Sequence, residues 1–569
     1  MAERHQKNEM KNLPACVCEF IRAVIKKMRY RRKVRQNVQN ELTAHFEDEL
    51  KDCHTDKERE QKAQQLISQF GDARLLGILC RRAKKRCRPL WQKALLLSLE
   101  AFAVIFLYLL ICSSRLIIGT PTIKVNYAAW LNDLVRQGRD ESLNAKPYFD
   151  KAVQLATGSP AFLEGFGKTW SYWPGDMNEP QRQAVEKLLE DNSAAFETLK
   201  KGVEKPYYWV NYSGKAGLVR DKSLDGEAMA FAWQYPGSLS GLIESREFLK
   251  EVSKSLAGYK VLIRQLAVRI LWEAYKGDLD GAFDDFLTSQ KFANHLQGKG
   301  LLMEQLVGIA VEAIAHDRIL VVLDKADVSA PLLTKAQQEL QKLYDQQKAI
   351  VSFEAGKAFW YDFVQRTFTD DGRGSGRPLG RALPVAVGSW KDEVIGFIFF
   401  NYPDRQEVIK TIDRFYEEAQ RLLNQTPWQS GTENRQKQLE EIAQNSFLLK
   451  LSAPYYGRIG NIFWRMKTHR EALVTVVAIM RYAKEKGQYT VSLDELVAAG
   501  YLKELPMDPY SDKPLIYKRT DDDFVLYSVG PNFTDDGGEL GVGQNGKPRM
   551  WADNGDWVFW PVLKPGSQE

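Results

Sequence analysis

The longest apolar run in the sequence begins more than ninety residues from its start. Residues 94–112 read ALLLSLEAFAVIFLYLLIC, nineteen positions of which only Glu100 is charged. At about 1.5 Å per residue, a helix of this length crosses a hydrocarbon layer about 30 Å thick. The pattern therefore predicts one transmembrane helix over 94–114, and its distance from the first residue argues against a secretory signal peptide.

Elsewhere the apolar positions mostly recur every three or four residues, which is typical of helices. Before the span, residues 19–83 predict two or three helices, with Gly71 ending one helix and Asp72 capping the next. After Pro121 the spacing predicts a large helical domain, with helices over 180–203, 257–277, 279–297, 299–325, 333–350, 405–424 and 433–449. The glycine-rich segment 370–381 predicts a flexible loop.

The last hundred residues change to an α+β pattern. A helix over 468–486 precedes a short helix that Ser492 can cap, and strands follow over 514–518 and 524–529. The run from Trp557 to Pro561 is costly to expose, so we expect it to pack back onto this module. The predicted fold class is mainly α, in four parts: a helical head (1–93), the span (94–114), a helical domain (121–465) and an α+β module (466–569).

Charge and cysteine are concentrated in the part that precedes the span. Residues 1–93 hold 23 Lys and Arg against 12 Asp and Glu, whereas residues 113–569 hold 56 against 60. Lysine and arginine are enriched on the cytoplasmic side of membrane helices, and all six cysteines lie at or before Cys112, as expected for thiols in a reducing compartment. Both patterns predict a cytoplasmic N-terminus and an extracytoplasmic body, with the lipid bilayer rather than a nucleic acid as partner of the basic run.

One motif in the head carries a family resemblance. The sequence Glu41-Leu42-x-x-His45-Phe46-Glu47-Asp48, followed by Phe70-Gly71-Asp72-Ala73, resembles the permease-prefix or HAAS-type helical signalling domain, which precedes transmembrane segments in bacterial proteins. The resemblance implies a cytoplasmic regulatory partner, with Glu41, His45, Glu47 and Asp48 as candidate contact residues. A histidine packed between helices is the alternative interpretation of His45. So small a head buries little apolar area, so contact with a second copy, as a homo-oligomer, is a further alternative.

The C-terminal module carries a second resemblance. Asp508-Pro509-Tyr510-Ser511 and the run from Leu526 to Asn532, followed by Asp-Asp-Gly-Gly, are similar to the C-terminal half of the major pseudopilin of type II secretion. That family binds calcium in the loop after its second strand. The resemblance implies Ca²⁺ ligands among the oxygen-bearing side chains of the matching region: Asn532, Asp535, Asp536, Glu539, Asp553 and Asp556. Such ligands on a glycine-rich loop suit Ca²⁺, and a solvated acidic turn is the alternative.

The sequence contains no familiar catalytic signature. G-x-S-x-G, H-E-x-x-H and P-loop motifs are all absent. Beyond the span, Glu312, His316 and Asp317 could share a helix face as a metal or acid–base site, although such side chains are more often salt-bridged. Short sequences such as PTIKVNYAAWLN and PYYWVNYSG resemble large membrane-anchored proteins of planctomycete-type bacteria, which implies no activity.

These patterns predict a non-catalytic, single-pass protein of the bacterial inner membrane that couples an extracytoplasmic body to a cytoplasmic partner by sensing or scaffolding. An anchored hydrolase of envelope or polysaccharide substrates is one alternative. The tryptophan-rich stretches 170–173 and 206–209 motivate it, and it requires two facing carboxylates. A structural component of an envelope or secretion assembly is another alternative. No cofactor is expected apart from the calcium ion.

Overall fold

Helices make up most of the chain. The computed structural model describes residues 12–86, 90–157, 173–212, 246–347, 349–379, 403–444, 446, 449, 453–543 and 546–562. The chain divides into two compact units, Met1–Ile111 and Cys112–Glu569. Within the described residues, named strands occur only between Met507 and Trp560. The mainly helical class predicted from the sequence is therefore confirmed.

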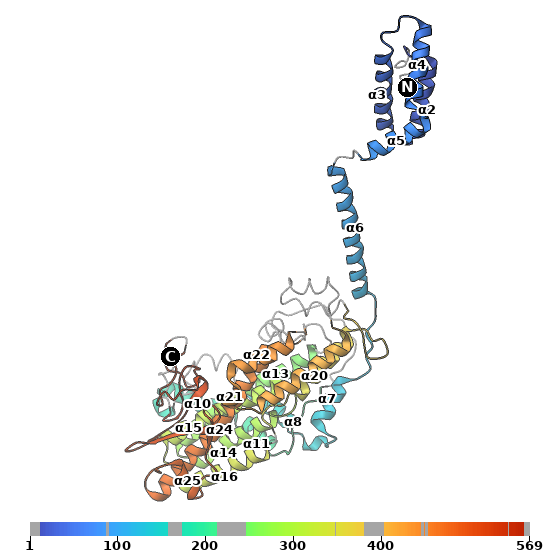
Figure 1. The fold of residues 1–569 in the computed structure, drawn as a ribbon. Helices are drawn as coiled ribbons and strands as arrows, with labels where there is room; N and C mark the ends of the chain where they lie inside the picture. Colours follow the sequence, from blue (N-terminus) through green and yellow to red (C-terminus); the bar gives the residue numbers. More distant parts are fainter. Residues whose placement is uncertain are drawn as a thin grey trace. The chain divides into compact units, whose positions relative to one another are not determined.

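The head (residues 12–86) is a bundle of α2 (Ala15–Met28), α3 (Arg32–Glu49), α4 (Asp56–Phe70) and α5 (Ala73–Arg86), drawn in blue in Figure 1. Apolar side chains at helical spacing on α2, such as Val17, Ile21 and Val24, are completely buried in its core. Thr55 starts α4 with a capping box. Asp72 accepts a hydrogen bond from the Arg74 amide, so the predicted cap of α5 is confirmed.

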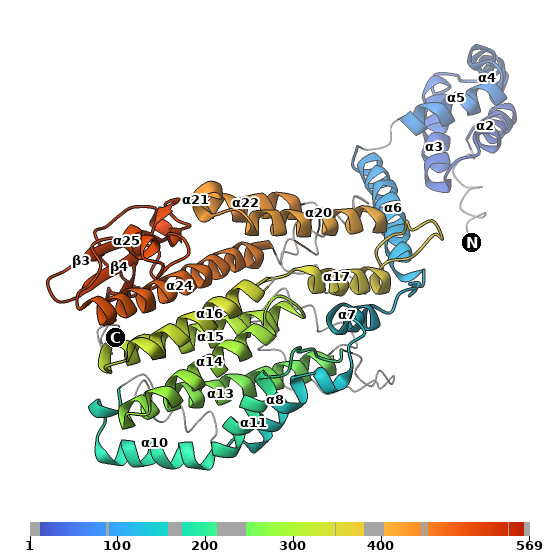
Figure 2. The same ribbon diagram turned by 90° about the horizontal axis from the view of Figure 1, so that it is seen from below.

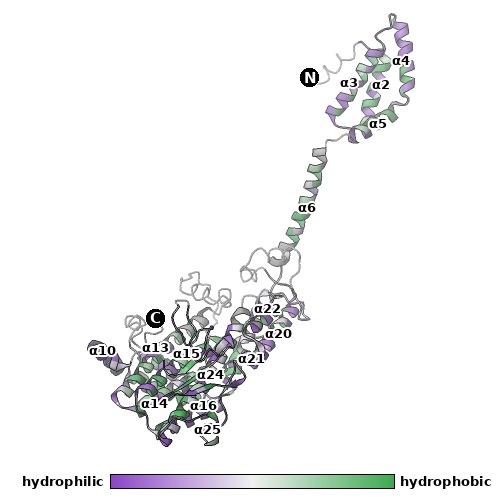
Figure 3. Cartoon of the chain, turned by 60° about the vertical axis from the view of Figure 1, so that its left-hand side comes forward, coloured by the Kyte–Doolittle hydropathy of each residue, from purple (hydrophilic) through white to green (hydrophobic). Residues whose placement is uncertain are grey.

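Helix α6 (Leu90–Ile117) carries the apolar run of the sequence. The window Ala94–Ile111 has a mean hydropathy of 2.5, and none of it is buried within the fold. Figure 3 shows the hydrophobic colour along most of this helix. So much exposed apolar surface on one helix is unfavourable in water. By length and composition it is the one helix among the described residues that can cross a membrane.

Long helices packed side by side form most of the second unit (Figure 2). In chain order they are α7 (Tyr127–Arg136), α8 (Lys146–Leu155), α10 (Glu179–Asp191), α11 (Ser193–Val203), α13 (Arg246–Lys276), α14 (Leu279–Leu296), α15 (Leu302–Lys325), α16 (Ala330–Gln346), α17 (Glu354–Thr367), α20 (Arg405–Leu423), α21 (Pro427–Ser430), α22 (Thr432–Ala443) and α24 (Ala453–Lys486). Helix α14 contacts α13 and α15, and α24 contacts α15, α16 and α22. The predicted helix 180–203 is split into two at Asn192.

The C-terminal strands form two small antiparallel sheets. Strand β1 (Met507–Asp508) pairs with β2 (Lys513–Pro514), and β4 (Phe524–Ser528) lies between β3 (Ile516–Arg519) and β5 (Trp557–Trp560). Ser492 caps the short helix α25 (Leu493–Ala498), as predicted. All four residues of β5 are buried, so the expected return of the apolar tail onto the module is confirmed.

Helix α24 joins the α+β module to the helical domain. It runs without a break from Ala453 to Lys486, across the predicted boundary between residues 465 and 466. One hydrophobic core includes Ile270 of α13, Val476 of α24 and Trp557 of β5. The module therefore shares a core with the helices and belongs to the same compact unit.

Candidate functional site

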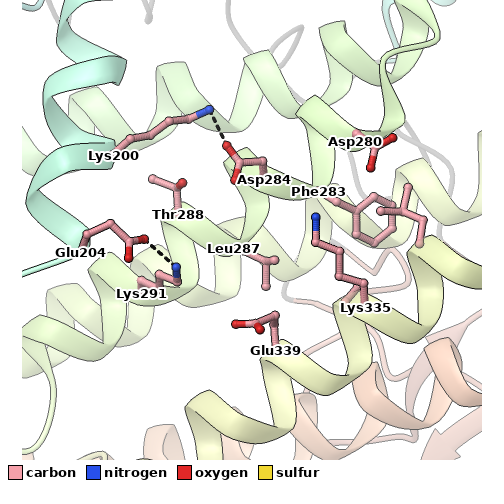
Figure 4. Close-up of a pocket in the computed structure, with 12 residues that line it drawn as sticks. Lys200, Glu204, Asp280, Phe283, Asp284, Leu287, Thr288, Lys291, Lys335 and Glu339 are labelled. Carbon is pink, nitrogen blue, oxygen red and sulfur yellow. Dashed lines mark hydrogen bonds and ion pairs between the residues drawn. The ribbon is translucent and has the colours of Figure 1, made fainter.

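A cavity of about 230 Å³ lies between α11, α14 and α16 (Figure 4). Its lining carries charges of both signs and an apolar part: Lys200, Lys291, Lys335, Glu204, Asp280, Asp284, Glu339, Phe283, Leu287, Thr288, Leu332 and Ala336. Lys200 Nζ lies 2.6 Å from Asp284 Oδ2, and Lys291 Nζ lies 2.7 Å from Glu204 Oε1. Figure 4 shows Lys335 extending from α16 toward α14, and within the described residues it forms no ion pair.

An ionic network behind the cavity wall fixes Lys200. Asp285 is fully buried, with Oδ1 3.0 Å from Lys200 Nζ and Oδ2 2.8 Å from Arg269 Nε. Burial raises the pKa of Asp285 to about 6, and the two cations oppose this rise. The network links α11, α13 and α14, so residues of three helices hold the Lys200 ammonium in place at the cavity wall.

The cavity is lined by charged and apolar side chains that could bind a small polar molecule. Its described lining holds no histidine or cysteine. The carboxyl groups of α14, α15 and α24 whose pKa burial raises do not line it; they are Asp285, Glu304, Asp317 and Glu471. A small molecule with one cationic and one anionic group would find a charged partner for each. Four carboxylates line the cavity, those of Glu204, Asp280, Asp284 and Glu339, and two of them pair with lysines. Residues 170–172, in the aromatic motif that motivates the hydrolase alternative, lie outside the described residues.

Glu312, one of the three candidate residues that the sequence places on one helix face, forms a buried ion pair. It is 1% exposed and forms a two-pronged pair with Arg470 of α24, in which Nε meets Oε1 and Nη2 lies 2.7 Å from Oε2. Gln297 donates to Glu312 at 2.7 Å and accepts from Arg470 at 2.8 Å. Gln347 accepts from Arg470 Nη1 at 2.6 Å. This network, which we call the Glu312–Arg470 network, connects α15 to α24 and to the ends of α14 and α16.

The histidines of the second unit are held neutral in the interior. His316 Nε2 lies 3.0 Å from the Tyr344 hydroxyl oxygen, and its ring meets that of His469 edge-on at 4.6 Å. Burial lowers the pKa of both rings well below the ordinary value, and it lowers the pKa of His295 to about 4. Among the described residues, no three His, Cys, Asp or Glu side chains are placed so that they could hold a metal ion.

The candidate calcium ligands gather around the loop that follows β4. Asp535 Oδ1 accepts hydrogen bonds from the Tyr527 hydroxyl and the Gly537 amide, both at 2.9 Å. Asp556 is fully buried; burial first, and then the nearby carboxylates of Asp536 and Asp535, raise its pKa. The other candidates are Asn532, which donates to Asp536 at 2.7 Å, and the exposed Glu539 and Asp553. Asp535 and Asp536 thus lie near Asp556, with hydrogen bonds within the loop on most of the carboxylate oxygens, but in this arrangement the three do not form a group that could hold a metal ion.

Calcium binding stays a prediction of the pseudopilin resemblance. Because a cation would offset the repulsion among Asp535, Asp536 and Asp556, millimolar calcium is expected to raise the melting temperature of the full-length chain. Magnesium at the same concentration serves as the control ion. The variant Asp535→Asn with Asp536→Asn should lose the rise. An unchanged melting temperature of the natural protein in calcium would contradict the prediction. The loop after β4 would then be an acidic turn that is stabilised only by its own hydrogen bonds.

The candidate contact residues of the head lie on α3 and are exposed: Glu41, His45, Glu47 and Asp48. Glu41 Oε1 pairs with Lys84 Nζ of α5 at 3.0 Å. The His45 ring meets Phe70 edge-on at 5.4 Å, so it is packed on one side and open to solvent on the other. A partner could reach these side chains, and their role in binding stays a prediction.

A clamp on the segment that leaves α6 was not predicted from the sequence. Gln365 of α17 is 2% exposed, and its Nε2 donates to the Val125 carbonyl oxygen at 2.7 Å. Its Oε1 accepts from the amides of Lys124 and Val125, both at 3.2 Å. The side-chain amide thus bonds this backbone on both its donor and its acceptor groups, as a neighbouring strand would.

Ion pairs extend the clamp to α20. The Asp370 side chain is 2% exposed, and its Oδ2 lies 2.7 Å from Lys124 Nζ and 2.6 Å from Arg405 Nη1. The Lys124 ammonium, then the Gly372 amide and the Arg405 guanidinium, hold the pKa of Asp370 well below its usual range. The carboxylate therefore stays charged and keeps both cations in place. We call Gln365, Asp370 and Arg405 the clamp.

The glycine-rich segment predicted to be flexible takes part in the same structure. Thr369 N donates to the Arg377 carbonyl at 2.9 Å, and Asp371 N donates to the Ser375 carbonyl at 2.8 Å. The Arg377 guanidinium donates to the Ile118 carbonyl at 2.7 Å. Residues 369–379 are thus bonded to themselves and to the segment after α6, whereas 380–381 lie outside the described residues.

Comparisons with protein-family models, with curated proteins and with solved structures find no match to this chain. Any function assigned to it therefore depends on its own residues and their arrangement.

Proposed function

We propose that the chain is a single-pass protein of the bacterial inner membrane, with α6 in the bilayer, the head in the cytoplasm and the second unit outside. The unburied window of mean hydropathy 2.5 supports α6 as the span. Seven basic residues within 81–93, against Arg115 and Lys124 soon after the span, support this orientation. The absence of cysteine after residue 112 in the sequence agrees with it.

In that topology the protein couples its outer unit to a cytoplasmic partner by sensing or scaffolding, without catalysis of its own. The clamp is the observation that carries this proposal. A loose tether would not transmit a change in the outer unit, whereas Gln365 and Asp370 fix Lys124 and Val125, seven and eight residues after the end of α6, to α17 and α20. The cavity between α11, α14 and α16 is the ligand site that we assign to the outer unit.

The two family resemblances fit into the same proposal. A bundle of short helices directly before a span agrees with a HAAS-type signalling head, and its exposed α3 residues Glu41, His45, Glu47 and Asp48 are the surface that we assign to the partner. The long helix α24 contacts β4 and β5 of an antiparallel sheet, which agrees with a pseudopilin-like cap. An extracytoplasmic loop would also meet enough calcium to fill a weak site.

Loss of the Gln365 side chain tests the clamp. In Gln365→Ala the amides of Lys124 and Val125 are expected to exchange their hydrogens about 10–100 times faster, because the hydrogen bonds that both donate to Gln365, worth about 1 kcal/mol each, are removed. Hydrogen exchange of the full-length protein in nanodiscs, read by mass spectrometry, measures this change.

Gln305→Ala is the matched control. Gln305 is also buried and also makes three backbone hydrogen bonds, to the Gly300 carbonyl and to both backbone groups of Ser352. It should leave the exchange of the Lys124 and Val125 amides unchanged. If these amides already exchange freely in the natural protein, the outer unit hangs from a loose tether and the coupling proposal fails.

A further inference from the structure

One face of helix α5 is apolar and uncovered. Leu75, Ile78 and Leu79 are 58%, 37% and 51% exposed and follow each other at helical spacing. The opposite face of α5 packs on α2 so closely that a Cβ on Gly77 would lie 2.7 Å from the Val24 carbonyl oxygen. Helix α5 is therefore held in the bundle by one side and presents three large aliphatic side chains on the other.

The charge of α5 indicates which kind of surface covers this face. The helix has no acidic residue. Arg81, Arg82 and Lys85 are exposed, and within the described residues they form no ion pair; Lys84 is the one that pairs with Glu41. Two copies of this face placed against each other would bring like charges together, whereas an anionic surface complements them.

The covalent connection sets where α5 can lie. Helix α5 ends at Arg86 and α6 begins at Leu90. Four peptide steps of at most about 3.6 Å each keep the two Cα atoms within about 14 Å of each other. If α6 spans the bilayer from Ala94, the basic end of α5 consequently stays within about 20 Å of the cytoplasmic edge of the hydrocarbon layer.

We propose that α5 is an interfacial helix, which lays the Leu75, Ile78 and Leu79 face onto the anionic cytoplasmic surface of the membrane while Arg81, Arg82 and Lys85 contact lipid phosphates. An amphipathic helix with basic residues beside an apolar stripe has the chemistry of such interfacial binding. This inference depends on the proposed role of α6 as a span, and it adds that the head is docked on the bilayer rather than suspended from it.

A photoreactive benzophenone amino acid in place of Leu79 tests the proposal in the full-length chain. The protein is placed in nanodiscs of phosphatidylcholine alone or with about 30% phosphatidylglycerol. After irradiation, lipid adducts are expected at position 79 and should be several-fold more abundant in the anionic discs. The same amino acid in place of the exposed Glu60 on α4 is the matched control, and it should give few or none. Arg81→Gln, Arg82→Gln and Lys85→Gln together should lower the yield at position 79 several-fold.

Two results would overturn the interfacial role of α5 and leave the proposed span intact. One is a chain retained in the discs with equal lipid adduct yields at positions 79 and 60. The other is adducts at position 79 that join two copies of the protein. A chain that is not retained in the discs would overturn the proposed span as well. Retention and adduct yield are measured separately, so the two failures can be told apart.

Discussion

Replacing Arg470 with methionine is expected to lower the free energy of unfolding of the second unit by about 3–5 kcal/mol, because the Glu312 carboxylate would stay buried without its cation. Thirteen of the fourteen tryptophans lie after residue 112, so tryptophan fluorescence during urea unfolding reports this unit. A loss below about 1 kcal/mol would contradict a structural role for the Glu312–Arg470 network.

Two variants show that the effect comes from the buried charge. In the double variant Glu312→Leu with Arg470→Met, most of the lost stability should return, because a buried pair replaced by apolar residues is often neutral. Arg421→Met removes a cation from the half-exposed pair with Glu418, whose atoms are 2.6 Å apart. That change should cost no more than about 1 kcal/mol.

The second large effect is expected from Gly298→Ala, at the turn between α14 and α15. Gly298 has φ of +74°, and a Cβ there would lie 2.1 Å from the Ala349 carbonyl oxygen. The left-handed conformation costs a residue with a side chain about 1–2 kcal/mol, and the forced shift also strains the 2.9 Å hydrogen bond from Gly298 N to the Ile350 carbonyl. We expect a total loss of about 2–4 kcal/mol in the same unfolding measurement.

Gly277→Ala is the matched control for this prediction. Gly277 has φ of +90°, yet nothing lies within 4 Å of its added Cβ. It should therefore show the conformational cost alone, about 1–2 kcal/mol. Equal losses for the two variants would show that the contact between Gly298 and Ala349 has no energetic role.

Features set by neighbouring residues could be predicted from the sequence. The cap of α25 by Ser492 and the cap of α5 by Asp72 are local hydrogen bonds, and the apolar run of α6 is a matter of composition. The apolar spacing predicts the start of α24 fifteen residues too late, because residues 453–467 show no clear apolar stripe. For residues 557–560 the sequence predicts burial against the module but not a β-strand. A strand that is buried on both faces shows no alternation of apolar and polar residues from which it could be recognised.

The candidate site depends on contacts between distant parts of the chain, and these leave no local pattern. Gln365 bonds backbone 240 positions earlier, and a single buried glutamine looks like any other in a helix. Glu312 was recognised as one end of a polar helix face, but its partner Arg470 is 158 positions away. The flexibility predicted for 370–381 stays a prediction; what the sequence does not reveal is that residues 370–379 carry hydrogen bonds within the loop and to Ile118.

As a transmembrane helix, α6 would place the head and the second unit on opposite sides of a membrane. Thiol labelling of intact spheroplasts with a membrane-impermeant maleimide tests it, in a Cys112→Ser background that leaves no natural thiol after Cys87. Val491 is 71% exposed, so Val491→Cys adds a single accessible thiol to the second unit. We expect that thiol to be labelled in intact spheroplasts, and the head cysteines to be labelled only after the membrane is permeabilised. Labelling of both sets before permeabilisation, or of neither, would contradict this membrane topology.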